Sequence, residues 1–178
     1  IMGVARRSQF TSTFLFAARF ASSASVHRVT TTPSACYVHL PFCRRRCFYC
    51  DFPIQVVGER RGAADLAAER YVSLVLREIQ ATPPTMAKTS LNSVYFGGGT
   101  PSLTPPHLIS RILEAVHARY DIAADAECTM EMDPGTFDMA RLQGFLDAGI
   151  NRVSLGVQSF DDALLESSGR ACTQAHRV

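Results

Sequence analysis

The stretch CYVHLPFCRRRCFYCDF (36–52) joins a short apolar run to a dense cluster of cysteines. Its opening residues, 36–40, are mostly apolar and predict a buried β-strand. Cys43, Cys47 and Cys50 follow at once with the spacing C-x3-C-x2-C. A buried strand that runs straight into a loop of reactive side chains is the arrangement by which parallel α/β proteins build a site at the carboxyl end of a strand.

The rest of the chain repeats the order of strand, loop and amphipathic helix. The clearest helix carries a stripe of apolar residues with helical spacing. These residues are Ala68, Val72, Val75, Leu76 and Ile79. Further strands are predicted over 91–96, 128–132 and 152–157. Further helices are predicted over 104–120, over 137–148 and from Asp161 onward. Thr104 is expected to cap the second helix, and Gly149 is expected to end the third.

Strands that alternate with helices predict an α/β fold with a parallel sheet. Because the polar and glycine-rich segments come just after strands, we expect a TIM-type (β/α) barrel of which about four βα units are present. Four units cannot close such a barrel. The sequence therefore predicts two regions, a separate segment over 1–34 and the N-terminal part of a larger domain over 35–178.

The segment 1–34 differs in composition from the rest of the chain. From Ile1 to Cys50 there is no Asp or Glu, whereas arginine recurs and serine and threonine are dense. This composition is typical of an organelle transit peptide, and we expect import into mitochondria, with a plastid as the alternative. A disordered basic tail or a secretory signal would have a similar composition. The apolar stretch Phe14–Ala18 is far shorter than the ~20 residues of a membrane span, so no transmembrane segment is expected.

The net charge of +2 gives no reason to expect a nucleic-acid partner. Four of the eighteen basic residues precede Pro33, so the remaining fourteen stand against sixteen acidic residues, a balance of −2. Nucleic-acid-binding domains instead gather basic residues on one surface.

The cysteines themselves point to a metal centre. Six cysteines in 178 residues are too few for a disulfide scaffold, and three of them lie within 43–50. Three thiolates on one short loop can each bind one iron of a cubane cluster, which leaves the fourth iron open to a ligand with adjacent amine and carboxylate groups. Cys36, Cys128 and Cys172 stand apart in apolar or helix-like surroundings and are interpreted as small buried hydrophobic residues.

Two other uses of the clustered thiols remain open on spacing alone. Zinc could take Cys43, Cys47 and Cys50 with His39 as a fourth ligand, although structural zinc sites usually take their second ligand pair from a distant turn. The histidines farther along the chain show no such spacing with a cysteine. A redox disulfide is the remaining alternative.

The cysteine motif and several other segments resemble one known family. C-x3-C-x2-C with an aromatic residue before its last cysteine, here Tyr49, is similar to the signature of the radical S-adenosylmethionine (SAM) superfamily. Within it, YVHLPFC, FGGGTPS, MEMDPGT and RVSLGVQSF, in that order over 37–170, resemble the group of anaerobic coproporphyrinogen oxidases and HemW-type haem chaperones. The resemblance implies a 4Fe-4S cluster on Cys43, Cys47 and Cys50, with SAM bound at the open iron.

The same resemblance implies a SAM pocket built from scattered positions. Tyr49 matches an aromatic residue near the adenine, and the turn 97–100 matches a glycine-rich motif whose backbone meets the methionyl amino group. Glycine is expected there because a side chain would block so close an approach. A phosphate loop is disfavoured because the lysine of G-x4-G-K-[ST] is missing. The positions that the resemblance assigns to SAM are Tyr37, Tyr49, Gly98, Gly99, Thr100, Glu131, Gln158 and Arg170.

Glu131 also stands out by alternation along its strand. A period of two places Thr129, Glu131 and Asp133 on one side and the sulfur-containing residues between them on the other. A carboxylate directed into a barrel needs a partner, which SAM would supply. On an exposed strand the same carboxylate would be a solvated charge.

The resemblance implies radical chemistry at the cofactor and two alternative functions. A reduced cluster would pass one electron to SAM, which splits into methionine and a 5'-deoxyadenosyl radical. The named residues bind cofactors, and no general acid, base or nucleophile is assigned. The cysteine motif of oxidase-type members resembles C-x3-C-x2-C-x-C, with a fourth cysteine two residues after the third. This chain has Phe52 at that position. We therefore expect a HemW-like haem chaperone rather than an oxygen-independent coproporphyrinogen-III oxidase.

The expected partners follow from that function. They are haem (as cargo) or a porphyrin, an electron donor for the cluster, and haem-accepting apoproteins. His39 is a weak candidate for a haem ligand and is interpreted as a structural histidine beside the cysteine loop. Arg44, Arg45 and Arg46 either favour thiolates and an anionic cluster or form a solvated surface. A zinc-stabilised interaction module without SAM chemistry is the third functional alternative.

Overall fold

A computed structural model describes residues 33–60, 62–82 and 90–170. The predicted transit segment, apart from its last two residues, lies outside the described residues, and so does Cys172. The main strands are β1 (Ala35–Leu40), β4 (Ser90–Gly98), β5 (Asp121–Met132) and β6 (Arg152–Leu155). The helices are α1 (Ala63–Ala81), α2 (Pro106–Arg119), α3 (Met139–Asp147) and α4 (Asp162–Ser167), and the short elements are β2 (Phe42–Cys43), β3 (Gln55–Val56) and the 3₁₀ turn η1 (Pro101–Leu103).

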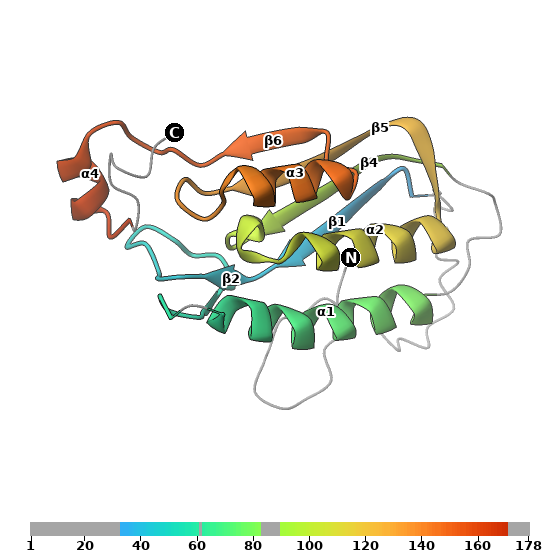
Figure 1. The fold of residues 1–178 in the computed structure, drawn as a ribbon, viewed down its shortest axis with the longest axis horizontal. Helices are drawn as coiled ribbons and strands as arrows, with labels where there is room; N and C mark the ends of the chain where they lie inside the picture. The colour runs from blue at the N-terminus through green and yellow to red at the C-terminus, as the bar shows by residue number, and fades with distance from the viewer. Residues whose placement is uncertain (1–32, 61, 83–89, 171–178) are drawn as a thin grey trace, which may run out of the picture.

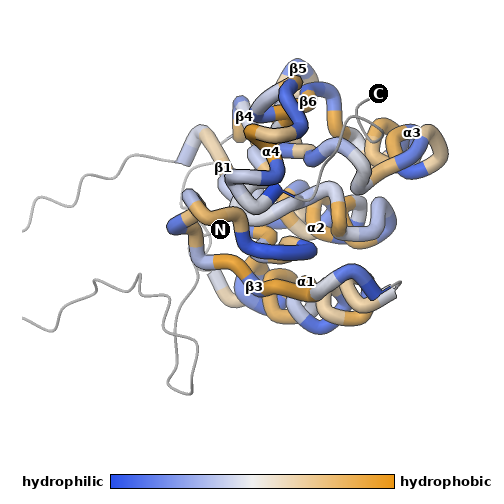
Figure 2. Tube along the Cα trace, turned by 90° about the vertical axis from the view of Figure 1, so that its left-hand side faces the viewer, coloured by the Kyte–Doolittle hydropathy of each residue, from blue (hydrophilic) through white to orange (hydrophobic). Residues whose placement is uncertain are grey.

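The four main strands form one parallel sheet in the order β1-β4-β5-β6. Each strand is followed by a helix, and α1, α2 and α3 lie together on one face of the sheet in two perpendicular views (Figure 1, Figure 2). The strand arrows point toward the side where β2 and α4 lie (Figure 1). Consecutive parallel strands with crossover helices form the first part of a TIM-type barrel, so the predicted fold class is confirmed.

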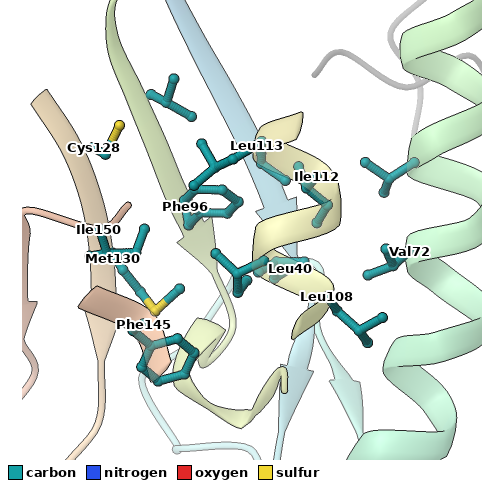
Figure 3. Packing of buried hydrophobic residues seen from close by; sticks show 14 of the residues in the cluster. Leu40, Val72, Phe96, Leu108, Ile112, Leu113, Cys128, Met130, Phe145 and Ile150 are labelled. Carbon is teal, nitrogen blue, oxygen red and sulfur yellow. The ribbon is translucent and has the colours of Figure 1, made fainter. Parts of the chain in front are cut away.

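The core lies between the sheet and the three helices (Figure 3). Val38, Phe96 and Met130 come from adjacent strands in matching register and are fully buried on this face. Val72 of α1 and Ile112 of α2 pack toward them and are also fully buried. Because burying one such side chain stabilises the fold by roughly 1.5–3 kcal/mol, this apolar layer holds the strand ends and their loops in place.

The main differences from the sequence-based boundaries concern β5 and α2. β5 begins at Asp121, several residues before the predicted start. Thr104 does not cap α2: the helix begins at Pro106, and Pro105 is the cap residue. The backbone N–H of Thr104 instead donates to Pro101 O and closes η1 (2.9 Å). A residue that precedes proline is disfavoured in the helical region, so Pro105, which precedes Pro106, is extended (φ −56°, ψ 140°) and the helix begins one residue later than a Thr104 cap requires.

The helices in the last part of the described chain begin at aspartates. The Asp138 carboxylate accepts from Arg141 N at the start of α3, and that of Asp161 accepts from the backbone N–H groups of Ala163 and Leu164 at the start of α4. Such caps satisfy N–H groups that have no partner within the helix. No helix among the described residues is both long and apolar enough to span a bilayer.

Candidate cofactor site

A cavity of about 220 Å³ opens at the carboxyl ends of the strands. Its walls come from the cysteine loop after β1, the glycine turn after β4, the end of β5 with the loop that follows, and the segments around Gln158 and Arg170. These segments are far apart in sequence, and the parallel sheet brings them to one edge. This edge is where the fold class builds its sites.

The three clustered cysteines all line this cavity and none forms a disulfide. The Thr100 hydroxyl donates to Cys43 Sγ at 3.5 Å. Burial, together with the neighbouring Cys50 and Cys47 thiols, raises the pKa of Cys43 in spite of that hydrogen bond. Only the thiolate is a metal ligand, so metal binding at this site would displace the thiol proton.

Zinc ligation by His39 is not compatible with the contacts of its ring. Nε2 lies 3.0 Å from the Pro53 carbonyl oxygen, to which it must donate, so Nδ1 accepts from the Tyr37 hydroxyl at 3.1 Å. Both ring nitrogens are therefore in use, which supports the interpretation of a structural histidine.

A single metal ion is also a poor match for the thiols. Within 33–60, 62–82 and 90–170, no three His, Cys, Asp or Glu side chains converge closely enough to hold one ion. A cubane cluster does not require such convergence, because each thiolate binds a different iron.

The cysteine loop is held to the far end of the described chain. Phe48 N donates to Ser168 O at 3.0 Å, and Arg46 Nη1 donates to Cys50 O at 2.8 Å. Gly169 has a positive φ of 72°, and a Cβ there would lie 3.0 Å from the Phe48 ring. Glycine at this position, two residues after α4, is favoured by its backbone conformation, and the exposed Phe48 ring would have to turn aside for a larger residue.

The arginines of the loop face a single acidic side chain. Arg44 and Arg45 each pair with Glu59, at 3.8 and 3.1 Å, and all three side chains are well exposed. Exposed ion pairs of this kind contribute little to stability. Arg44 and Arg45 also line the cavity, so they add positive charge near the thiols.

The glycine turn after β4 is shaped by packing against β1 and the loop that follows it. A Cβ at Gly98 would lie 2.6 Å from the His39 ring, and one at Gly99 would lie 2.7 Å from the backbone of Pro41 and Phe42. The sequence analysis expected ligand approach to be the reason for glycine here. Contacts within the protein already require glycine at both positions, and both residues line the cavity.

Glu131 extends from β5 into the cavity and is held by two donors. Its Oε1 accepts from the Tyr95 hydroxyl at 2.8 Å, and its Oε2 accepts from Gly98 N at 3.2 Å. Burial and the hydrogen bond to this carboxylate raise the pKa of Tyr95 to about 12, so the phenol stays protonated as a donor. Each carboxylate oxygen keeps a second lone pair with which it can accept from a bound ammonium group.

Arg170 supplies the opposite charge at the cavity. Its Nη2 donates to Asp133 Oδ1 and, at 2.6 Å, to Gly156 O, while Nη1 lies 3.9 Å from Cys47 Sγ. Burial is the largest influence and disfavours the charged form, but Asp133, Tyr49 and Cys47 together outweigh it, and the pKa of Arg170 is raised. The Nε atom is buried without a hydrogen-bond partner among the described residues.

The two predicted tyrosines lie in different places. Tyr49 lines the cavity as expected. Tyr37 stacks on Tyr95 with ring centroids 6.1 Å apart, and it is not among the described residues that line the cavity. Its contact with SAM therefore stays a prediction. Gln158, also a predicted contact, lines the cavity with an unusual positive φ of 64°.

Sequence reasoning missed the loop after β5 as part of the site. Asp133, Pro134, Gly135 and Thr136 all line the cavity, and Asp133 forms the ion pair with Arg170. The signal was present, because period-two alternation had already placed Asp133 on the same side of the strand as Glu131.

The residues present fit a 4Fe-4S cluster with SAM. Cys43, Cys47 and Cys50 line one wall, and Glu131 and Arg170, whose Nε is buried without a hydrogen-bond partner among the described residues, line others. A ligand with an ammonium and a carboxylate group would satisfy both Glu131 and Arg170 Nε. The donor set therefore suits the amino-acid end of SAM next to an open iron.

Comparisons with known proteins agree with this fit. The chain is 51% identical over 143 residues to the heme chaperone HemW of Synechocystis sp. and 40% identical over 137 residues to the mitochondrial radical S-adenosyl methionine domain-containing protein 1 of Bos taurus. These matches cover 78% and 77% of this chain but only 33% and 30% of the relatives, so the chain spans about a third of their length.

A solved structure supports the same fold. The radical SAM enzyme coproporphyrinogen III oxidase (HemN) from Escherichia coli matches with a TM-score of 0.72 and 28% sequence identity, over 84% of this chain and 33% of that one. A family model described as the radical SAM superfamily matches residues 37–178. With the motif spacing, the fold and the relatives in agreement, the chain belongs to the radical SAM superfamily.

Proposed function

We propose that the chain is the N-terminal part of a HemW-like haem chaperone and that residues 35–178 begin its radical SAM core domain. The observation that carries the proposal is the cavity itself, which gathers Cys43, Cys47 and Cys50 from the loop after β1, Glu131 from β5 and Arg170 from the segment after α4. The similarity to several proteins named heme chaperone HemW supports the same function.

In this proposal the three cysteines hold a 4Fe-4S cluster, and SAM completes the cluster's coordination. When bound, this pair can supply one-electron cleavage of SAM. Glu131, held by Tyr95 and Gly98, would accept from the methionyl amino group, and Arg170 Nε would donate to its carboxylate. Thr100, Tyr49 and Gln158 line the rest of the cavity and would limit the access of water to the bound cofactor.

Haem handling is favoured over porphyrin oxidation by Phe52. Phe52 lines the cavity. It stands at the motif position where the oxidase-type pattern C-x3-C-x2-C-x-C has its fourth cysteine. Phenylalanine cannot ligate iron, so that additional ligand is missing here. Haem is thus proposed as cargo, with an electron donor and haem-accepting apoproteins as partners.

The test separates the two functions directly. The full-length protein, anaerobically reconstituted with iron and sulfide, is titrated with haem and then assayed for haem transfer to an apoprotein and for coproporphyrinogen turnover. The proposal expects haem binding and transfer without porphyrin turnover. Turnover of coproporphyrinogen, lost in a Cys43→Ser variant, would support an oxygen-independent coproporphyrinogen-III oxidase instead.

Residues 1–34 are proposed as a mitochondrial transit peptide. Their Arg-rich, acid-free composition and the mitochondrial relative from Bos taurus support this location. A fluorescent protein fused to these residues is expected to enter mitochondria, and a variant with Arg6, Arg7 and Arg19 changed to Glu is expected to stay outside. Accumulation in plastids would contradict the proposal.

A further inference from the structure

Two buried hydroxyl groups join the loops on either side of the cavity. Ser102 belongs to η1 after β4 and is completely buried, while Thr136 follows β5 and is 9% exposed. Their Oγ and Oγ1 atoms lie 2.5 Å apart. Ser102 Oγ also accepts from Asp133 N at 3.2 Å, and Thr136 Oγ1 donates to Asp133 O at 2.6 Å.

These contacts fix the direction of every proton in a closed ring. Thr136 has one hydroxyl proton, and it goes to the Asp133 carbonyl, which can only accept. The proton between the two hydroxyls must therefore come from Ser102. Ser102 Oγ in turn accepts from Asp133 N–H. Each hydroxyl thus donates once and accepts once, and both backbone polar groups of Asp133 are held.

The ring holds the residue that positions Arg170. The Asp133 carboxylate accepts from Arg170 Nη2, and the same guanidinium reaches Cys47 Sγ and Gly156 O. The Arg170 side chain is only 9% exposed. Contacts run continuously from the two hydroxyls through Asp133 to the guanidinium that faces the cavity.

We propose that Ser102 and Thr136 are positioning residues for SAM, which act through Asp133 to aim Arg170 into the cavity. This inference rests on the proposed SAM site. Among the described residues Thr136 lines the cavity and Ser102 does not, but both hydroxyls are engaged in the ring and act on SAM through Asp133. Their role is to fix Asp133 in a loop that would otherwise be free to shift, since a misplaced partner would turn Arg170 Nε away from the SAM carboxylate.

Apolar side chains at 102 and 136 could not form the hydrogen bonds that hold the backbone of Asp133. Removal of the Ser102 hydroxyl takes away the acceptor of Asp133 N–H and the donor to Thr136 Oγ1, while Thr136 still donates to Asp133 O. Losing these two buried hydrogen bonds favours a shift of the loop that restores them elsewhere. Such a movement takes the Asp133 carboxylate with it, so the effect would be felt at the cavity.

The test compares SAM affinity in matched variants of the reconstituted full-length protein. Ser102→Ala and Thr136→Ala each break the ring, and SAM binding measured by anaerobic equilibrium dialysis is expected to weaken about tenfold. Thr136→Ser keeps the hydroxyl and should recover most of the affinity. Ser73→Ala removes an exposed hydroxyl on α1 that bonds to Arg70 O and is the control. Iron content should stay at the wild-type value in all four.

A double-mutant cycle separates positioning from general destabilisation. If Ser102 acts through Arg170, then Ser102→Ala should cause no further loss of SAM affinity in an Arg170→Ala background. If the two losses add, or if Ser102→Ala and Thr136→Ala bind SAM as tightly as the wild type, the inference is wrong. Should Ser102→Ala fail to fold, Thr136→Ala and Thr136→Ser answer the same question when each is compared in the wild-type and the Arg170→Ala background, because Thr136 itself lines the cavity. A wild-type protein that holds iron but binds no SAM would instead refute the proposed cofactor site.

Discussion

The loops after β1 and β4 lie side by side at the cavity but are built in opposite ways. In the loop after β4, Ser102 and its neighbours in η1 are buried, and the backbone is bonded to β1 and the residues after it through Gly99 N to Leu40 O and Thr100 N to Phe42 O. In the cysteine loop after β1, Phe48 is 80% exposed. One loop is therefore a preformed wall, whereas the other has few buried contacts of its own.

The difference shows where each loop obtains its order. The wall after β4 is fixed by packing, so it keeps its shape without a ligand. The cysteine loop relies on two or three backbone contacts and exposed ion pairs, which stabilise little. A cluster with three bonds to this loop would supply the missing cross-links, as metal binding does in other small sites.

The largest expected effect is the loss of the cluster itself. A Cys43→Ser variant should fail to retain a 4Fe-4S cluster after anaerobic reconstitution, because two thiolates and a hydroxyl cannot replace the three-thiolate set. Iron analysis and visible absorption provide the measurement. Cys128→Ala, which changes a cysteine buried in the core, is the control and should retain wild-type iron. Equal iron in both variants would contradict the assignment.

The preformed wall can be broken by one methyl group. A Cβ at Gly99 would meet the backbone of Pro41 and Phe42 at 2.7 Å, and backbone cannot move aside easily. Gly99→Ala should lower the free energy of unfolding by about 3 kcal/mol in denaturant titrations.

Gly58→Ala is the matched control for that substitution. Gly58 has a positive φ of 77° but no atom near the added Cβ, so only backbone strain of about 1 kcal/mol is expected. If Gly58→Ala proved as costly as Gly99→Ala, the close packing between the two loops would not be the reason for glycine in the turn.

A smaller effect, on SAM affinity, is expected when the hydrogen bond between Tyr95 and Glu131 is removed. Tyr95→Phe removes the hydroxyl that holds Glu131 Oε1, a loss of about 1 kcal/mol and therefore about fivefold in SAM affinity. Isothermal titration of the reconstituted protein measures it. Tyr120→Phe, at the end of α2, is the control and should leave SAM affinity unchanged. If Tyr95→Phe bound SAM as tightly as the wild type, the hydrogen bond from Tyr95 would not be needed to position Glu131.

The smallest effect is expected for the ion pairs of the cysteine loop. Glu59→Gln removes the partner of Arg44 and Arg45, whose side chains are exposed. The free energy of unfolding of the reconstituted protein should fall by less than about 1 kcal/mol, and the change should diminish at high salt. A larger loss would mean that the loop is ordered by its charges rather than by the cluster.

Sequence patterns predicted the sheet, its helices and most of the candidate site. Apolar runs and helical spacing are local properties, so the strand over 91–96 and the apolar stripe that contains Val72 could be predicted without a structure. The part that was missed depends on contacts between distant segments. Thr104 was predicted to cap α2, but Pro106 keeps Pro105 out of the helical conformation and the helix begins one residue later. The hydrogen bond between Ser102 and Thr136 joins loops that are distant in sequence and that the sheet brings together.

The role of the glycine turn shows the same limit. Its position after a strand and its composition were visible in the sequence, but the reason for glycine at 98 and 99 was not. That reason lies in the His39 ring and in the backbone of 41–42, which are distant in sequence and approach only through the parallel pairing of β1 with β4.

Electron paramagnetic resonance of the reduced, reconstituted protein tests the central claim most directly. A 4Fe-4S cluster held by Cys43, Cys47 and Cys50, with one iron open, predicts about four irons per chain and a spectrum that changes when SAM is added. The Cys43→Ser variant should give neither. A protein that binds zinc without charge-transfer absorption, or a cluster spectrum that SAM leaves unchanged, would contradict the account.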